Sequence, residues 1–260
     1  MKPSFPRSSL LFLLAGFLLA SNYCDNRKPP LIVVPHIIST LPHDSAAFTQ
    51  GLFFDQGFLY ESDGLYGESA LRSIDAKSGS TIKRIALAPN LFAEGCAKSG
   101  DDLVQLTWRE QRAFIYDLKT IAKHDSLIYA GEGWGLTSDG NQFFMSDGSD
   151  TITVRNKDFS IIKKLPITSQ GIAVTKLNEL EWANHKLYAN MWFSDRIAEI
   201  EAKSGHVLRW IDCSSILQKE KPASPDYVLN GIAFDAATGI FYITGKKWKN
   251  YYLVRLASDR

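Results

Sequence analysis

A small set of polar side chains stands at equivalent positions of a sequence repeat, and its composition suggests chemistry as well as binding. It contains one carboxylate, Glu94, one amine, Lys246, and the amides of Gln50, Asn178 and Asn230. The same positions also carry three large aromatic residues, which are Trp108, Trp134 and Trp192. Aromatic walls with a few convergent polar groups are typical of a pocket for a small ligand. Binding alone does not require an acid, a cation and amides in one ring.

These residues keep a fixed distance from five apolar segments that recur along the chain. The segments are centred on Leu59, Leu103, Phe143, Leu187 and Phe241, at steps of 44, 40, 44 and 54 residues. Nine residues before the first four centres stand Gln50, Glu94, Trp134 and Asn178, and Asn230 takes this place in the fifth unit if its turn has two extra residues. Five residues after the centres stand Gly64, Trp108, Gly148, Trp192 and Lys246.

The repeat predicts an all-β, five-bladed β-propeller. Each apolar centre follows a turn rich in Gly, Asp or Asn, which is typical of a β-hairpin, and two further strand-like segments follow in each unit. Four strands at a period of about 40–50 residues make one propeller blade. The fifth unit lacks its outermost strand, so we expect residues 31–38 to pair there and close the ring. One domain would then cover residues 31–260.

The register predicts that the polar and aromatic residues meet at one mouth of the central channel. The first set opens the innermost strand of each blade, and the second set ends the neighbouring strand. In an antiparallel hairpin the start of one strand lies beside the end of its partner. Gly51, Gly95, Gly135 and Gly231 follow the first set in four units, where the backbone of a neighbouring blade should approach closely. Glu179 breaks this pattern in the fourth unit.

Composition narrows the class of partner. The 260 residues carry a formal net charge of +1, which argues against a nucleic-acid-binding surface. Three cysteines, Cys24, Cys96 and Cys213, form neither a disulfide framework nor a CxxC zinc motif. Pairing of Cys96 with Cys213 stays open, and we expect a monomer.

The N-terminus has the pattern of a secretory signal peptide. Within residues 1–22, Lys2 and Arg7 precede an apolar run over residues 10–20, which is short for a membrane span. The cleavage point and lipidation of Cys24 stay open, as does the alternative of an uncleaved anchor. We expect an exported protein, periplasmic or secreted, with no stable membrane span after processing.

Motifs in every blade resemble the plant-type glutaminyl-peptide cyclotransferases, a family with bacterial relatives, of which we expect this chain to be one. They are FTQGL at 48–52, YESDGLYG at 60–67, LTW at 106–108, GEGWGLT at 131–137, LNELE at 177–181 and TGK at 244–246. The resemblance implies a five-bladed propeller that converts N-terminal glutaminyl residues of peptides and proteins to pyroglutamate with release of ammonia. It also implies that no metal or other cofactor takes part.

The same resemblance assigns roles to the residues of the two register positions. It matches Glu94 to the catalytic glutamate of the family and Lys246 and Asn178 to pocket residues. The chemistry of the reaction makes Glu94 the candidate general acid/base, and Lys246 and Asn178 the other candidate catalytic residues, either of which could stabilise the oxyanion. The substrate-binding residues would be Gln50, Trp108, Trp134 and Trp192. The sequence departs from the family pattern at Ala93, where Gly is common, and at Cys96, where Leu or Ile is usual, which would place a thiol near the site.

Two other functions fit a propeller. A non-catalytic propeller that binds a peptide or glycan would also place tryptophans around the channel, and a calcium-dependent lactonase would need several axial carboxylates. The remaining polar residues suggest structural roles. The five histidines share no register and are expected at the surface or in turns, Glu61 and Asp63 in a solvated loop, and Glu132 either beside the site or as a loop cap.

Overall fold

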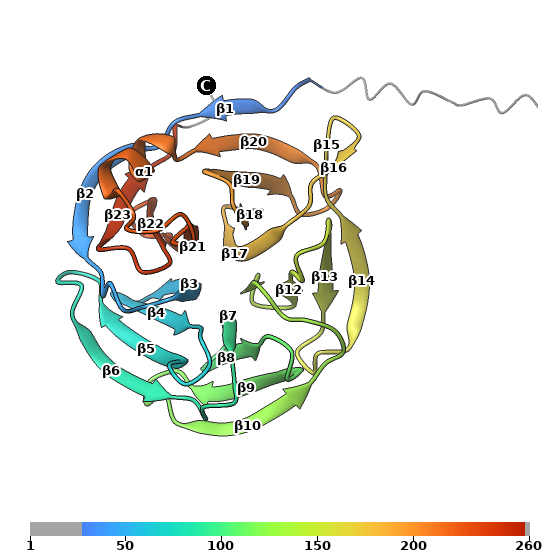
Figure 1. The fold of residues 1–260 in the computed structure, drawn as a ribbon. Helices are drawn as coiled ribbons and strands as arrows, with labels where there is room; N and C mark the ends of the chain where they lie inside the picture. Colours follow the sequence, from blue (N-terminus) through green and yellow to red (C-terminus); the bar gives the residue numbers. More distant parts are fainter. Residues whose placement is uncertain (1–27, 258–260) are drawn as a thin grey trace, which may run out of the picture.

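The computed structural model describes residues 28–257, in which five sheets of four or five strands are arranged around a central axis (Figure 1). Blade one contains β3 (Thr49–Asp55), β4 (Phe58–Asp63), β5 (Ala70–Asp75) and β6 (Thr81–Ala86). Blade two contains β7 (Ala93–Ser99), β8 (Asp102–Thr107), β9 (Arg112–Asp117) and β10 (Lys123–Ile128). Blade three contains β11 (Leu136–Ser138), β12 (Phe143–Met145), β13 (Thr151–Arg155) and β14 (Ile161–Pro166).

Blades four and five contain the C-terminal strands. Blade four contains β17 (Leu177–Ala183), β18 (Lys186–Met191), β19 (Arg196–Glu201) and β20 (Val207–Asp212). Blade five contains β21 (Leu229–Asp235), β22 (Ile240–Gly245), β23 (Asn250–Arg255) and, from the N-terminal end, β2 (His36–Pro42). A hairpin of β15 (Thr168–Ser169) and β16 (Ile172–Ala173) follows blade three, and the helix α1 (Ser214–Glu220) joins blades four and five. The fold is therefore the predicted five-bladed propeller with one short helix added.

The repeat centres all lie on the second strand of their blades, which confirms the period. Side chains from adjoining sheets form the core, since one apolar cluster joins Phe53 and Leu71 of blade one to Leu103 and Phe114 of blade two. Such contacts between blades hold the ring together, because a single blade cannot bury both of its faces.

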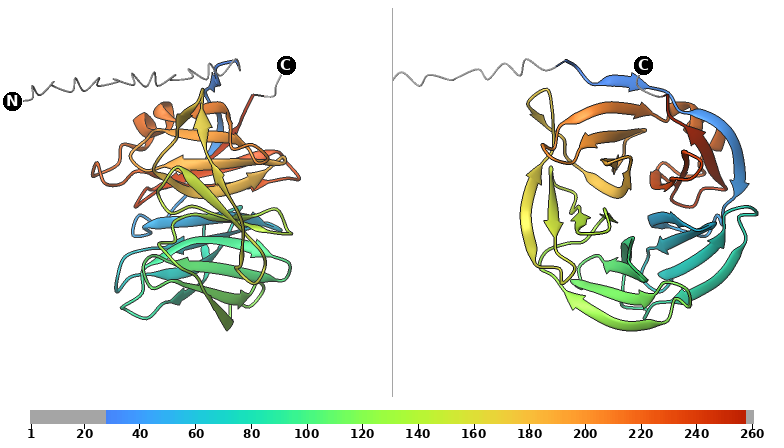
Figure 2. Two further views of the ribbon diagram at one scale, coloured as in Figure 1. Left: turned by 90° about the vertical axis from the view of Figure 1, so that its right-hand side faces the viewer. Right: turned by 180° about the vertical axis from the view of Figure 1, so that it is seen from behind.

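The ring closes by the expected kind of pairing, with a shifted boundary. β2 pairs antiparallel with β23 as the outer strand of blade five, while β1 (Leu31–Val33) pairs parallel with β20 of blade four. Figure 2 shows this N-terminal segment passing along the outside of both blades. Pro35 lies in the short break between β1 and β2. Proline cannot donate to a strand ladder, so the chain changes sheets at this point.

The inner strands approach closely at the predicted glycines. A Cβ added to Gly51 would lie 2.5 Å from the Cys96 amide nitrogen of the next blade, and Gly95 and Gly135 meet the following blades in the same way. Gly231 differs, because it has φ +132° and faces side chains of Thr244 and Thr49. Glu179 stands in place of a glycine, and its carboxylate accepts hydrogen bonds from the amides of Leu52 (3.2 Å) and Ile232 (2.9 Å). It therefore joins blade four to blades one and five.

The two described cysteines are unpaired and buried. Cys96 belongs to the apolar cluster between blades one and two, and Cys213 belongs to another between blades four and five. Cys96 therefore packs in the core, and its thiol does not line the site as the sequence comparison had suggested. No helix within residues 28–257 is long and apolar enough to cross a membrane. The predicted signal peptide, residues 1–22, and Cys24 lie outside the described residues.

Candidate active site

All seven residues predicted for the site line one cavity of about 290 Å³ at a mouth of the central channel. They are Gln50, Glu94, Trp108, Trp134, Asn178, Trp192 and Lys246. Asn230 is fully buried outside this lining, where its Nδ2 donates to Gln50 Oε1 at 3.2 Å. The register therefore located the cavity, while the fifth blade contributes Lys246 to its lining and Asn230 to its support.

The strand geometry explains why these positions converge. Glu94 is the second residue of β7, and Trp108 follows the last residue of β8 directly. The Trp108 amide donates to the Phe92 carbonyl at 2.9 Å, which joins the two ends of this hairpin. Blade five repeats the arrangement, with a 2.9 Å bond from the Lys246 amide to the Val228 carbonyl.

Glycines at the same register position make room for the aromatic walls. A Cβ on Gly64 would lie 2.5 Å from the Phe92 ring, and a Cβ on Gly148 would lie 2.8 Å from the Trp134 indole. Gly148 also has φ +81°, which favours glycine. At this register position, three blades therefore place a large side chain in the lining, which is Trp108, Trp192 or Lys246. The other two blades have glycine, which leaves space for the ring of Phe92 or Trp134.

Glu94 is a buried carboxyl group without a hydrogen-bond donor. Its side chain is 4% exposed, and no hydrogen bond among residues 28–257 involves its carboxylate. Burial raises its pKa well above the usual range, and the negative charges of Glu132 and Glu110 add to this, while Lys246 opposes it. A carboxyl group with a raised pKa can exist in both protonation states near neutral pH, as proton transfer requires.

Lys246 is the cation whose charge interacts with Glu94. It is 5% exposed, and burial lowers its pKa to about 8, against the opposing effect of Glu94. Its Nζ lies 4.6 Å from the centre of the Phe48 ring, a cation–π contact that stabilises the charged form in a dry site. Glu94 and Lys246 thus have pKa values that burial moves toward each other.

The two amides of the cavity differ in how they are held. Asn230 Nδ2 donates to the Oε1 atom of Gln50, while the Gln50 Nε2 group makes no hydrogen bond among the described residues. The Oδ1 atom of Asn178 is buried and has no hydrogen-bond partner. A buried polar atom without a partner costs free energy, so a ligand that supplies the missing hydrogen bond would be favoured.

Glu132 holds two of the tryptophans in place. Its Oε2 atom accepts hydrogen bonds from the indole Nε1 of Trp108 (2.8 Å) and of Trp134 (3.1 Å). Arg109 completes the arrangement, since its Nε donates to Glu132 Oε1 at 3.0 Å and its guanidinium lies 3.8 Å from the Trp108 ring centre. Of the two roles considered for Glu132, support of the site is the one observed.

The cavity also contains residues that the sequence analysis did not select. These are Phe48, Leu65, Phe92, Phe193 and Asp226. Phe48 and Phe92 each stand two residues before an inner-strand position, so the alternation of side chains along a strand would have placed them on the same face. Leu65, Phe193 and Asp226 belong to connecting segments, for which the repeat provides no register.

A buried polar network lies between blades one and five, where the sequence predicted surface and loop residues. Glu61 is fully buried and accepts hydrogen bonds from His43 Nε2 (2.8 Å), Thr49 Oγ1 (2.6 Å) and Tyr251 Oη (2.9 Å). His43 Nδ1 also bonds to the Trp248 carbonyl at 2.8 Å. The prediction of turn or surface roles was therefore wrong for His43, as was that of a solvated loop for Glu61 and the buried Asp63. Their contacts come from different blades and share no sequence spacing.

Within residues 28–257, no group of three or more His, Cys, Asp or Glu residues is arranged to hold a metal ion. The carboxylates near the axis, Glu179 and Glu181, instead accept hydrogen bonds from backbone amides of neighbouring blades.

The fold and the cavity together define a five-bladed propeller with an aromatic, acid-containing pocket, and comparison with known proteins gives its family. Residues 9–256 match the family model described as "Glutamine cyclotransferase", and the chain belongs to this family. It is 36% identical over 226 residues to a glutaminyl-peptide cyclotransferase of Arabidopsis thaliana, covering 85% of this chain and 70% of the relative. The crystal structure of glutaminyl cyclase from Myxococcus xanthus is also 36% identical, with a TM-score of 0.84, and the match covers 89% of this chain and all of that one.

Proposed function

We propose that this protein is a glutaminyl-peptide cyclotransferase that converts N-terminal glutaminyl residues to pyroglutamate and releases ammonia. The observation that carries the proposal is the buried, donor-free carboxyl of Glu94 opposite Lys246 in an aromatic pocket. Family membership supports the reaction class. The residue roles rest on the geometry of the site.

In this reaction the α-amine of the substrate attacks its own γ-carboxamide carbon. One C–N bond forms, the bond to the amide nitrogen breaks, and ammonia leaves. Glu94 accepts a proton from the attacking amine and donates it to the departing nitrogen, so the carboxylate is restored after each turnover. The raised pKa of Glu94 suits both transfers.

The tetrahedral intermediate carries negative charge on the former amide oxygen. Lys246 Nζ and the Asn178 amide are the groups of this cavity that can stabilise this oxyanion. The unpartnered Asn178 Oδ1 can in turn accept a hydrogen bond from a substrate N–H group. These two residues therefore act as catalytic residues beside Glu94.

The aromatic walls hold the substrate in a folded conformation. A cavity of about 290 Å³ is at the small end of ligand pockets, which suits one glutaminyl residue. Trp108, Trp134 and Trp192 exclude water and bring the amine near the amide carbon, and Gln50 donates from its free amide nitrogen. The substrates are then peptides and proteins with N-terminal Gln.

The cellular setting and the metal requirement are part of the proposal. The pattern of residues 1–22 supports export to the periplasm or outside the cell. The site contains groups for acid–base and oxyanion chemistry, which supports turnover without a metal or other cofactor. We also propose that the protein acts as a monomer, because its ring closes within one chain.

Ammonia release from a dipeptide with N-terminal Gln tests the function. The wild type is compared with Glu94→Gln, with and without EDTA, and Glu68→Gln serves as a matched control at an exposed acid that is not in the cavity lining. Loss of a positioned acid–base group typically lowers the rate ~10²–10⁴-fold, so Glu94→Gln should lose practical turnover while its melting temperature is retained.

Each other result has a definite meaning. More than about a tenth of the activity in Glu94→Gln would remove Glu94 from the acid–base role. Loss of activity in EDTA would keep the reaction and overturn the metal-free mechanism. A folded wild type that releases no ammonia would leave a propeller that binds a peptide or glycan.

A further inference from the structure

Two loops line the catalytic cavity and a second cavity beside it. The first loop, residues 192–195, follows β18, and the second, residues 221–228, joins α1 to β21. They contribute Trp192, Phe193 and Asp226 to the catalytic cavity. They also form most of an adjacent groove of about 270 Å³, whose lining includes Phe193, Asp195, Pro222, Pro225 and Tyr227. Phe193 is the wall that the two spaces share.

Phe193 is held at the rim by an uncommon backbone conformation. Its φ is +61°, in the left-handed region that bulky residues rarely adopt, and its side chain is 53% exposed. The loop is stabilised by a 3.0 Å bond from the Ser194 amide to the Met191 carbonyl. An exposed aromatic ring beside a buried site, in a conformation that costs energy, indicates a functional position.

When the first residue is bound for reaction, the rest of the peptide must extend out of the catalytic cavity. The amine and the carboxamide of the first residue must both reach Glu94, while its carbonyl carbon remains bonded to the second residue. The cavity holds about one residue, so the second residue lies at the rim, and the groove begins there at Phe193.

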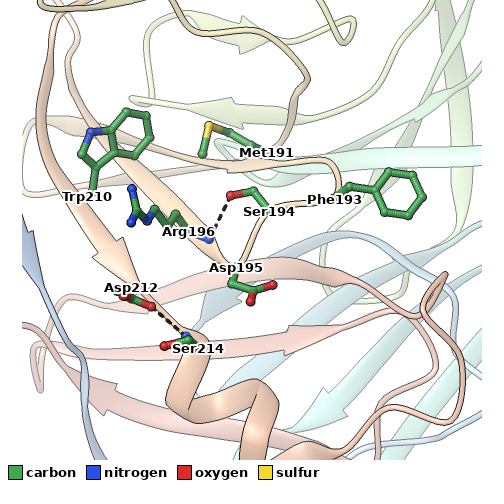
Figure 3. Close-up of a pocket in the computed structure, with 8 residues that line it drawn as sticks. All are labelled: Met191, Phe193, Ser194, Asp195, Arg196, Trp210, Asp212 and Ser214. Carbon is green, nitrogen blue, oxygen red and sulfur yellow. Dashed lines mark hydrogen bonds between the residues drawn. The ribbon is translucent and has the colours of Figure 1, made fainter.

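The groove has apolar walls and one charged group. Pro222, Pro225 and Tyr227 provide the walls, and Asp195 is the only Asp, Glu, Lys, Arg or His residue in the lining. Lys247, outside the lining, has its Nζ 5.9 Å from the centre of the Tyr227 ring. The Asp195 carboxylate makes no hydrogen bond or ion pair within residues 28–257. Arg196 does not neutralise it, because Arg196 extends toward Trp210 and Met191 in a further cavity that Asp195 also borders (Figure 3).

We propose that this groove binds the residue that follows the N-terminal glutamine, and that Asp195 makes it favour a long basic side chain. The proposal rests on the proposed function. A lysine or arginine would place its aliphatic stem against the proline and tyrosine walls and its charged end beside the carboxylate. Asp195 is thus a specificity-determining residue outside the catalytic cavity.

The test compares kcat/KM for the peptides Gln-Arg-Ala, Gln-Leu-Ala and Gln-Glu-Ala, with glutamine amide as a substrate that has no second residue. The attraction within an exposed ion pair is modest, and repulsion of glutamate adds to the contrast, so we expect about a 5–10-fold preference for Arg over Glu at low salt. Asp195→Asn should reduce this preference to below about 2-fold, mainly through KM, and should leave turnover of glutamine amide unchanged.

Controls separate this proposal from the function on which it rests. Asp101→Asn removes an exposed carboxylate in the turn between β7 and β8, at the end of this hairpin that is remote from Glu94 and Trp108. This variant should keep the wild-type preference. Raising the salt concentration should weaken the preference in the wild type, because exposed charges are screened. Equal rates for the three peptides, or the same preference in Asp195→Asn, would overturn the groove assignment alone. No turnover even of glutamine amide would overturn the proposed function and this inference with it.

Discussion

Two buried glutamates lie in neighbouring blades of this propeller, and their pKa values are shifted in opposite directions. Glu94, at the channel mouth, has no hydrogen-bond donor among the described residues, and burial raises its pKa well above the usual range. Burial also opposes the ionisation of Glu61, between blades one and five, but the charge of His43, hydrogen bonds from His43 and Thr49 and the charge of Arg72 lower its pKa. Burial is common to both, so the nearby charges and hydrogen-bond donors set the direction of each pKa shift.

The difference separates a structural carboxylate from a reactive one. Glu61 and His43 form a paired network between blades one and five. Burial lowers the pKa of His43, but Glu61, the hydrogen bond to the Trp248 carbonyl and the charge of Asp63 together raise it above its usual value. At the channel mouth, the Glu94 carboxyl group and the Asn178 Oδ1 atom have no hydrogen-bond partner among residues 28–257. Unpaired buried groups cost stability, and the site keeps them available for a substrate.

The largest expected effect on stability comes from removing Glu61. Glu61→Ala leaves the buried donors of His43, Thr49 and Tyr251 without their acceptor, and breaking a buried pair typically costs ~3–5 kcal/mol in the free energy of unfolding. Glu94→Ala is the matched control and should cost less than about 1 kcal/mol, because no donor loses its partner. Urea unfolding of both variants measures the contrast. Equal destabilisation would show that the two carboxyl groups are not held differently.

Lys246→Met should have the next largest effect, on the rate. Loss of an oxyanion-stabilising group typically lowers kcat ~10²–10³-fold, or about 2.7–4 kcal/mol. Because the pKa of Lys246 is about 8, wild-type activity should fall as the pH rises above that value and the charge is lost. The variant should lack this alkaline limb in its pH–rate profile.

The free energy of unfolding should depend on the charge of Lys246 with the opposite sign to the rate. The unfolded chain holds this proton more tightly than the folded protein, so the charged form costs stability at neutral pH, and the cost disappears as the pH rises through the region above about 8. The folded variant should therefore be no less stable than the wild type at pH 7. A less stable variant with an unchanged alkaline limb would assign Lys246 a structural role.

The sequence predicted the ring and most of the pocket because both depend on a repeat. Spacing from the apolar centres placed Glu94, Lys246 and Trp108 at one mouth, and side-chain alternation would have added Phe48 and Phe92. The network of Glu61 and His43 could not be found in this way. Its members come from different blades and positions, so only the folded chain brings them together.

The repeat also could not predict the loop residues or the boundary of the strand that closes the ring. Phe193, Asp195 and Asp226 lie in connections of irregular length, where no period fixes the direction of a side chain. The boundary of the closing strand depends on Pro35, which ends one pairing and starts another in the next sheet.

The most direct test of the account is the pKa of the Glu94 carboxyl group. Infrared difference spectra of wild type minus Glu94→Gln, recorded across pH, identify the C=O band of the protonated acid, and Glu61→Gln provides the reference for the paired site. We predict that the Glu94 band persists well above pH of about 4.3, the ordinary value for glutamate, and that Glu61 is ionised there. A Glu94 carboxyl that ionises at or below its ordinary pKa would contradict its role as the proton-transferring group.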